Sequence, residues 1–222
     1  LIKIFTFSPQ HQMTIEIDGT SYCDQTMHYW KQAGVNRISI RPRPIKELNL
    51  ITQSYVQEMS DLLSRLLCYF NQVNIDFLLP STQLNAQWRS LFSELIALPF
   101  THISLYQDEQ VENKEGWKAG YSFAVKELKK RGFNQYEMLH FTKGETSKQL
   151  QAYWNMDEIH AFGIKAVSFD GNTRTYNVTE TETYIAQVNK GTLPIVHSEK
   201  LTENELGTEW MMMNLLRSCG VD

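Results

Sequence analysis

The spacing of hydrophobic residues along the chain switches repeatedly between the period of a strand and the period of a helix. Met13–Asp18 alternates apolar and polar residues, which predicts a strand. Between residues 51 and 71 the apolar residues recur at helical spacing instead. The first part of the chain predicts strands at 13–18, 35–40, 73–79 and 102–106, and helices at 21–32, 51–71, 84–98 and 116–131. Thr20 or Ser21 is expected to cap the first helix.

Strand and helix in alternation, repeated about four times, predict a parallel sheet with right-handed crossovers. The predicted strands are largely apolar, so we expect them to be buried on both faces. The pattern changes after Gly132, where shorter strands are predicted at 135–141, within 159–169 and at 172–177, and helices at 181–190 and 202–218. Thr202-Glu203-Asn204-Glu205 is typical of a capping box. The chain is therefore divided into a part with alternating strands and helices, residues 1–132, which the resemblance described below identifies as the barrel part, and an extension, residues 133–222.

Composition narrows the class of protein. The chain has 222 residues, 42% of them hydrophobic, and a net charge of −4, so no general basic surface attracts nucleic acid. The basic cluster Lys126, Lys129, Lys130 and Arg131 is interpreted as the solvated face of a helix. No apolar run of about 18 residues predicts a membrane span, and no secretory signal pattern is present. A cytoplasmic location is expected.

Cysteine and histidine patterns predict no metal centre. Cys23, Cys68 and Cys219 are odd in number and far apart, which argues against a disulfide framework. We expect each to be a buried or inert thiol, with Cys68 on the apolar stripe of its helix. The six histidines include no pair at helical ligand spacing, and no phosphate-binding loop is found.

Several segments occur in an order that is specific when taken together. The clearest is Ala33-Gly34-Val35-Asn36-Arg37-Ile38-Ser39-Ile40, followed by Ile75–Pro80, His102–Tyr106, Gly132–Glu137 and Tyr153-Trp154. Together they resemble radical-SAM proteins of the oxygen-independent coproporphyrinogen III oxidase and heme-chaperone family, along nearly all of the chain. The resemblance implies an α/β fold: a partial, open parallel βα barrel of the radical-SAM type with a C-terminal α+β extension.

The resemblance also implies S-adenosylmethionine (SAM) and a [4Fe-4S] cluster held by Cys-x3-Cys-x2-Cys. This chain has no such motif, so we expect neither group to be bound by it. The family's Gly-Val-Gln-Ser is replaced by Arg41-Pro42-Arg43-Pro44, and its His-Asn-x-x-Tyr-Trp reads Gln149-Leu150-Gln151-Ala152-Tyr153-Trp154, without the histidine. Whether the chain is an enzyme stays open at this point.

Four residues are the candidate binding site by this resemblance. Glu16 and Asp76 are expected near the carboxyl ends of strands, the edge that carries function in βα barrels. Arg37 and Arg41 would bind carboxylates of SAM or of a tetrapyrrole. The alternative is that these four residues form structural ion pairs with one another.

Three functions follow as hypotheses, of which a working coproporphyrinogen III oxidase ranks lowest because the residues on the SAM side have diverged. In the first, the chain is a divergent relative of heme chaperones and coproporphyrinogen III oxidases that binds a tetrapyrrole such as heme. In the second, it is a non-catalytic scaffold or protein-interaction relative that has lost iron–sulfur and SAM binding. Because an open barrel exposes a sheet edge, we also expect either pairing with another copy or chain, or a missing N-terminal segment.

Overall fold

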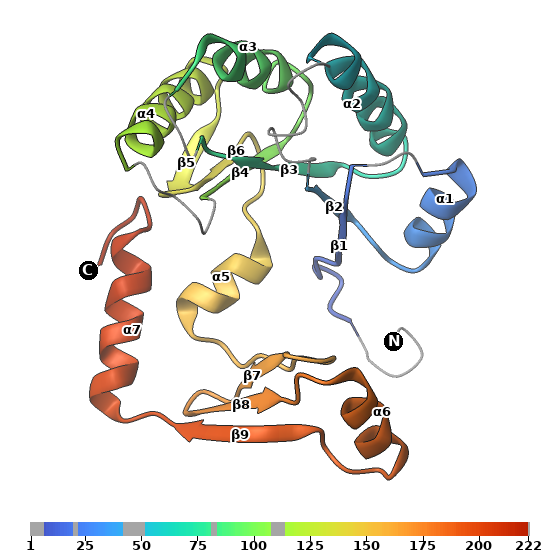
Figure 1. Cartoon of the computed structure of the whole chain (residues 1–222), viewed down its shortest axis with the longest axis vertical. Coiled ribbons are helices and arrows are strands. Elements are labelled where there is room, and N and C mark those ends of the chain that lie inside the picture. The colour runs from blue at the N-terminus through green and yellow to red at the C-terminus, as the bar shows by residue number, and fades with distance from the viewer. Residues whose placement is uncertain (1–6, 20–21, 42–51, 81–83, 108–113, 222) are drawn as a thin grey trace. The chain divides into compact units, whose positions relative to one another are not determined.

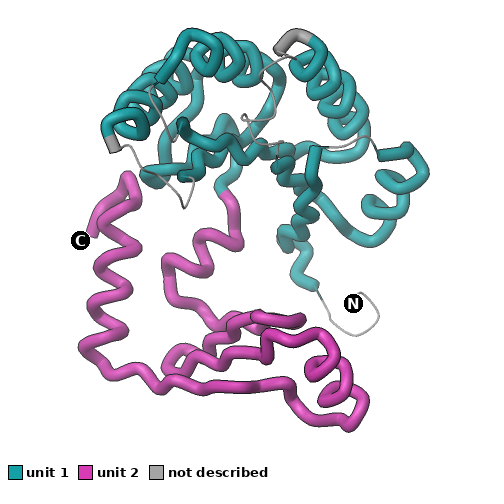
Figure 2. The backbone as a smooth tube through the Cα atoms, viewed as in Figure 1, with its two compact units in different colours: residues 1–146 teal, residues 147–222 magenta. Residues whose placement is uncertain are grey.

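The structure is a computed structural model that describes residues 7–19, 22–41, 52–80, 84–107 and 114–221. The chain separates into two compact units, residues 1–146 (unit 1) and 147–222 (unit 2), shown in different colours in Figure 2. The predicted cap residues Thr20 and Ser21 and the loop residue Arg43 lie outside the described residues. None of the described helices is long and apolar enough to cross a membrane.

Unit 1 is built on a six-stranded sheet with the order β1-β2-β3-β4-β6-β5. The first four strands are parallel and hydrogen-bonded in sequence order. Their bounds are β1 (Thr14–Ile17), β2 (Arg37–Ile40), β3 (Gln72–Leu78) and β4 (His102–Tyr106), and the helices that alternate with them are α1 (Asp24–Gln32), α2 (Thr52–Leu67), α3 (Ala86–Leu95) and α4 (Lys114–Lys130). The predicted alternation of strand and helix is confirmed.

The helices of unit 1 cover one face of this sheet (Figure 1). Right-handed crossovers between strands in sequence order place every helix on the same side. Ile40, Ile75 and Ile103 are fully buried at neighbouring positions of β2, β3 and β4, and they belong to one hydrophobic core with Leu63 and Phe92 of the helices. The core therefore lies between sheet and helices.

The strand predicted at residues 135–141 is instead a hairpin of β5 (Asn134–Glu137) and β6 (His140–Thr142). The carboxylate of Glu137 accepts a hydrogen bond of 2.8 Å from the backbone N–H of Leu139, which holds the turn. β6 runs antiparallel between β4 and β5, so the sheet is mixed at this end. Sequence periodicity did not reveal the reversal, because its turn contains neither glycine nor proline.

Side chains link the two ends of unit 1 at the edge of the sheet where the parallel strands begin. The amide of Gln12 donates to the side chain of Gln72 over 2.8 Å, and Gln72 donates to the Glu145 carboxylate over 2.7 Å. Gln12 precedes β1 and Glu145 follows β6. The two points where the chain enters and leaves this sheet are therefore close together.

Unit 2 contains a three-stranded antiparallel sheet with the order β7-β8-β9. Its elements are α5 (Lys148–Asn155), β7 (Val167–Phe169), β8 (Thr173–Asn177), α6 (Thr181–Asn189), β9 (Ile195–Lys200) and α7 (Glu203–Leu215). The capping box of Thr202 and Glu205 at the start of α7 is confirmed. The sequence analysis missed α5 and β9.

The hairpin β5–β6 belongs to unit 1, because β6 pairs with β4. The compact units therefore meet at residue 146, whereas the sequence divides the chain at residue 132 on the change of pattern. The division at residue 132 into a barrel part and an extension therefore stays a prediction.

Candidate functional site

The candidate site is the face of the unit 1 sheet that lies opposite its helices. Every second residue of the central strands is polar, and parallel register places these residues side by side. Ser39 of β2 lies opposite Asn74 of β3, and Asn74 lies opposite His102 of β4. Asp76 and Ser104 form the next pair along the same strands. The expectation that these strands are buried on both faces is confirmed, but one of the two faces is polar.

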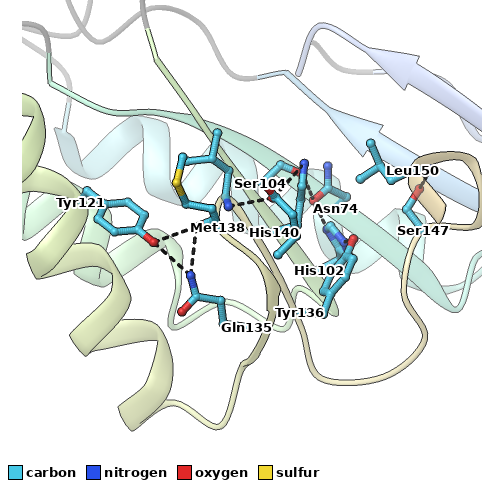
Figure 3. A network of polar contacts seen from close by, with 12 residues as sticks. Asn74, His102, Ser104, Tyr121, Gln135, Tyr136, Met138, His140, Ser147 and Leu150 are labelled. Atoms are coloured by element: carbon cyan, nitrogen blue, oxygen red, sulfur yellow. Dashed lines mark hydrogen bonds and ion pairs between the residues drawn. The ribbon is translucent and has the colours of Figure 1, made fainter. Parts of the chain in front are cut away.

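Asn74 is the centre of a hydrogen-bond network on this face (Figure 3). Its amide nitrogen donates to the Ser39 hydroxyl over 2.7 Å and to Asp76 Oδ1 over 2.6 Å. Its amide oxygen lies 2.6 Å from His102 Nδ1 and accepts from the Ser104 hydroxyl over 3.2 Å. One side chain thus links three strands.

His102 is held between Asn74 and the hydroxyl of Tyr136, which lies 2.6 Å from His102 Nε2. Both partners of His102 belong to other strands. Burial lowers the pKa of His102 well below its usual value, and the positive charge of Arg37 acts in the same direction. The imidazole is therefore neutral at physiological pH, with both ring nitrogens engaged.

Two opposite charges are buried on this face. Arg37 and Asp76 each expose only 6% of their surface. Burial lowers the pKa of the Arg37 guanidinium, while Tyr136 and Asp76 oppose the shift. Burial also raises the pKa of Asp76, against the hydrogen bond from Asn74. Among the described residues, Arg37 makes no side-chain hydrogen bond or ion pair of its own.

Glu16 and Arg41 form the exposed rim of the site. Arg41 Nη2 lies 3.7 Å from Glu16 Oε2, and both side chains are about two-thirds exposed. An exposed pair at that distance contributes little to stability, so either group can exchange its partner for a ligand. Tyr106, which ends β4, is half-exposed near this rim, and partial burial together with Asp76 and Glu16 raises its pKa to about 12.

His140 is the second neutral imidazole of the face. Its pKa is lowered to about 4 by burial and then by the charge of Arg37. Nε2 lies 3.7 Å from Glu137 Oε2, and burial raises the pKa of that carboxyl. Burial therefore favours the neutral form of both the His140 imidazole and the Glu137 carboxyl group.

The structure brings the four predicted site residues to one sheet face. Glu16 pairs with Arg41, and the charges of Glu16 and Asp76 both act on Arg37. Their roles toward a ligand stay a prediction. The sequence analysis missed Ser39, Asn74, Ser104, Tyr136 and Tyr106. A signal for the first three was present, since each stands at every-second-residue spacing from another polar residue in an otherwise apolar strand.

The chain's own residues do not fit a [4Fe-4S] cluster. Cys23, Cys68 and Cys219 are all exposed and free, and no group of three metal-binding side chains occurs among the described residues. Cys68 was expected in the core but follows the last residue of α2 on an exposed position. The polar face itself offers the guanidinium groups of Arg37 and Arg41 together with the carboxylates of Glu16 and Asp76, which suit an anionic or zwitterionic ligand.

Comparisons with known proteins place the chain among relatives. No protein-family model matches it. The heme chaperone HemW of Bacillus subtilis (strain 168) is 23% identical over 232 residues, which cover 95% of this chain and 61% of that protein. Coproporphyrinogen III oxidase (HemN) from Escherichia coli, a radical-SAM enzyme, has a similar fold, with a TM-score of 0.78 at 15% identity over 97% of this chain and 57% of that chain. The chain thus spans about three-fifths of the length of these relatives.

Proposed function

We propose, from the premise that this chain is HemW/HemN-like in sequence and fold, that it binds a tetrapyrrole such as heme on the polar face of unit 1. The observation that carries the proposal is the similarity to a heme chaperone along 95% of the chain. In the proposed complex the sheet is the inner wall of an open barrel, and the ligand lies along the polar face between Arg37 at the start of β2 and Arg41 directly after its end.

Arg37 and Arg41 are the proposed contacts to the propionate groups. Arg37 is buried without an ion pair among the described residues, and a buried charge without a partner is costly. An incoming carboxylate would satisfy it with charge-assisted hydrogen bonds. Arg41 needs only to release its long, exposed contact with Glu16.

In the proposed complex no histidine of the polar face binds the iron of heme. Both ring nitrogens of His102 are engaged, and the side chain of His140 exposes only 12% of its surface. We therefore expect iron-free protoporphyrin IX to bind about as well as hemin, since the propionates rather than the iron make the contacts.

Titration with hemin and with protoporphyrin IX tests this proposal. Binding is followed by the Soret band for hemin and by fluorescence for the iron-free ring. Arg37→Met and Arg41→Met should each weaken both ligands about tenfold, because one charge-assisted contact is lost. Arg89→Met is the matched control, since Arg89 stacks on Phe123 of α4, on the helix side of the sheet. Saturable binding with the same affinity in the wild type and in the Arg37→Met and Arg41→Met variants would show that the ligand binds elsewhere. The absence of any binding would refute the proposal.

The second candidate is a non-catalytic relative without iron–sulfur or SAM binding. It is favoured by the replacement of the family's Gly-Val-Gln-Ser by Arg41-Pro42-Arg43-Pro44, in which proline removes backbone donors and arginine adds bulk. Anaerobic reconstitution of the protein with iron and sulfide tests it. A brown protein with cluster absorption would exclude this candidate, and a colourless one would support it.

A further inference from the structure

Unit 2 contains a pocket of about 350 Å³ that lies outside the proposed tetrapyrrole site. Its volume is within the range of ligand pockets, about 300–1,000 Å³. Tyr153 at the end of α5, Phe169 of β7 and Met213 of α7 line it, so three elements of unit 2 converge there. All of its lining residues lie within 153–213, in unit 2.

Small side chains leave room in its wall. Ala161 and Ala166 line the pocket in the segment between α5 and β7, where larger apolar residues would fill it. This segment is tied down, because the Ala161 N–H donates to the Ser168 hydroxyl over 2.9 Å. The bridge between Ile159 and Phe169 holds the segment against β7. The space beside the two alanines is therefore bounded by a segment that hydrogen bonds hold in place.

Backbone strain is concentrated at the same wall. Within the described part of the chain, Met156 (φ 57°) and Lys165 (φ 58°) are the non-glycine residues with positive φ. Met156 caps the end of α5, where glycine is usual, and its side chain lines the pocket. Lys165 directly precedes Ala166. Residues held in sparsely populated conformations cluster at ligand sites, and here both flank one pocket.

The single cation in the wall already has its counter-ion. Arg174 of β8 forms a bidentate pair with Glu209 of α7, with Nη1 2.9 Å from Glu209 Oε1 and a second, shorter contact from Nη2. The guanidinium also lies 5.7 Å from the ring centre of Phe169. Two of its five N–H groups donate to Glu209, and Arg174 also interacts with the hydroxyl of Tyr176. The positive charge in the wall is therefore balanced by Glu209.

We propose that this pocket binds an uncharged apolar molecule of one to a few rings, which packs against the aromatic and methionine side chains of the wall. Burial of the rings against apolar walls is favourable because it removes apolar surface from water. A cation would meet Arg174 in the wall, and an anion would have to compete with Glu209 for Arg174, so both are disfavoured. Met156 and Met213 are flexible enough to fit closely around ligands of different shape. This binding is independent of the proposed tetrapyrrole site.

Two fluorescent ligands of nearly the same shape test the proposal on the full chain. N-phenyl-1-naphthylamine is neutral, and 1-anilinonaphthalene-8-sulfonate carries the same rings with a negative charge. The wild-type protein should bind the neutral compound at least about tenfold more tightly. Glu209→Gln removes the counter-ion of Arg174 and should shift the preference toward the sulfonate. Equal binding of both compounds by the wild type would overturn the charge argument, as would an unchanged preference in the Glu209→Gln variant.

Filling the wall tests the location. Ala161→Leu and Ala166→Leu approach the pocket from different points and should each weaken the neutral compound roughly tenfold or more, because the added methyl groups occupy its space. Ala186→Leu on the exposed side of α6 is the matched control and should bind as the wild type does. Far-UV circular dichroism checks that each variant is folded. Wild-type affinity in both folded wall variants, or no binding by the wild type, would refute the site.

Discussion

Asn74 is a residue whose substitution should reveal how strongly the polar face is held together. Its side chain is 1% exposed and bonds to four neighbours on three strands. Buried polar groups that lose a partner carry their full desolvation cost, and the cost grows when one of them is charged. The stability that the hydrogen-bond network contributes therefore depends mainly on the side-chain amide of Asn74.

Asn74→Ala should lower the free energy of unfolding by about 3 kcal/mol, because Asp76 and His102 both lose a partner. Ser104→Ala removes only the 3.2 Å bond to Asn74 and should cost about 1 kcal/mol. Urea denaturation followed by tryptophan fluorescence measures both changes. Equal costs for the two variants would contradict the central role of Asn74.

His140 should make unit 1 sensitive to mild acid. Its pKa is about 4 in the folded protein against an ordinary 6.5, so the unfolded chain takes up the proton first as the pH falls. Stability from this group is present above about pH 6.5 and is lost as the pH falls toward 4. Between pH 7 and pH 5 we expect a loss of about 2 kcal/mol that His140→Asn does not show.

The measurement is urea denaturation of wild type and variant at both pH values. Burial raises the pKa of Asp76 and of Glu137, which favours the folded state at lower pH and opposes the histidine effect. His102 shifts in the same direction as His140. All three groups remain in the variant, so the difference between the two proteins isolates His140. An identical pH response would contradict the burial of its neutral ring.

The sequence allowed the four charged residues of the candidate site to be chosen, because the family resemblance points to them and they stand in or directly beside predicted strands. It did not allow their neutral partners to be found. Ser39 and Ser104 are chemically unremarkable in sequence, and only the register between strands shows that they share a face. The role of Tyr136 depends on the β5–β6 hairpin, which was predicted as one strand.

At the scale of the elements, α4 approaches the end of β3 through a glycine. A Cβ atom on Gly120 would lie 2.6 Å from both Cγ and Cδ of the Pro80 ring, which cannot move aside as a flexible side chain does. Gly207 of α7 has no atom within 4 Å of the same position. The two helical glycines therefore differ in what surrounds them.

Gly120→Ala should destabilise the protein by about 1–3 kcal/mol, since the clash outweighs the better helix propensity of alanine. Gly207→Ala should stabilise α7 by about 0.5–1 kcal/mol, because only propensity acts there. Chemical denaturation followed by far-UV circular dichroism compares the two. A stabilising Gly120→Ala would show that α4 does not pack closely on Pro80.

The elements predicted most successfully are helices with one buried face and strands that are buried on both faces. The four parallel strands and their helices follow hydrophobic spacing directly, and β4 matches its predicted range of 102–106. β9 escaped prediction because nearly all of its residues are exposed, so no apolar alternation marks it. α5 is short and rich in glutamine, and its single buried residue, Trp154, sets no period.

At the scale of the whole molecule, the two units differ in the size of their cores. Among the described residues of unit 2, only Trp154, Phe169, Val178 and Leu201 are buried hydrophobic residues. Unit 1 holds a far larger hydrophobic cluster that extends from β1 to β6. Because stability grows with the apolar surface that is buried, unit 2 should open first.

We therefore expect unfolding in two steps, with unit 2 exchanging its amide hydrogens at lower urea concentration than unit 1. Thr202→Ala, which removes the capping box of α7, should shift only the first step, by about 1 kcal/mol. Hydrogen exchange read by mass spectrometry assigns each step to its residues. Simultaneous exchange of both units at every concentration would contradict separate stability.

The link from Gln12 through Gln72 to Glu145 has a consequence for how unit 1 can be re-engineered. Since the entry and exit points of its sheet are neighbours, a few added residues can join them into a continuous backbone. New termini can then be opened elsewhere, which is the condition for circular permutation. A permuted unit 1 would keep every strand pairing of its sheet while changing the order in which the strands are synthesised.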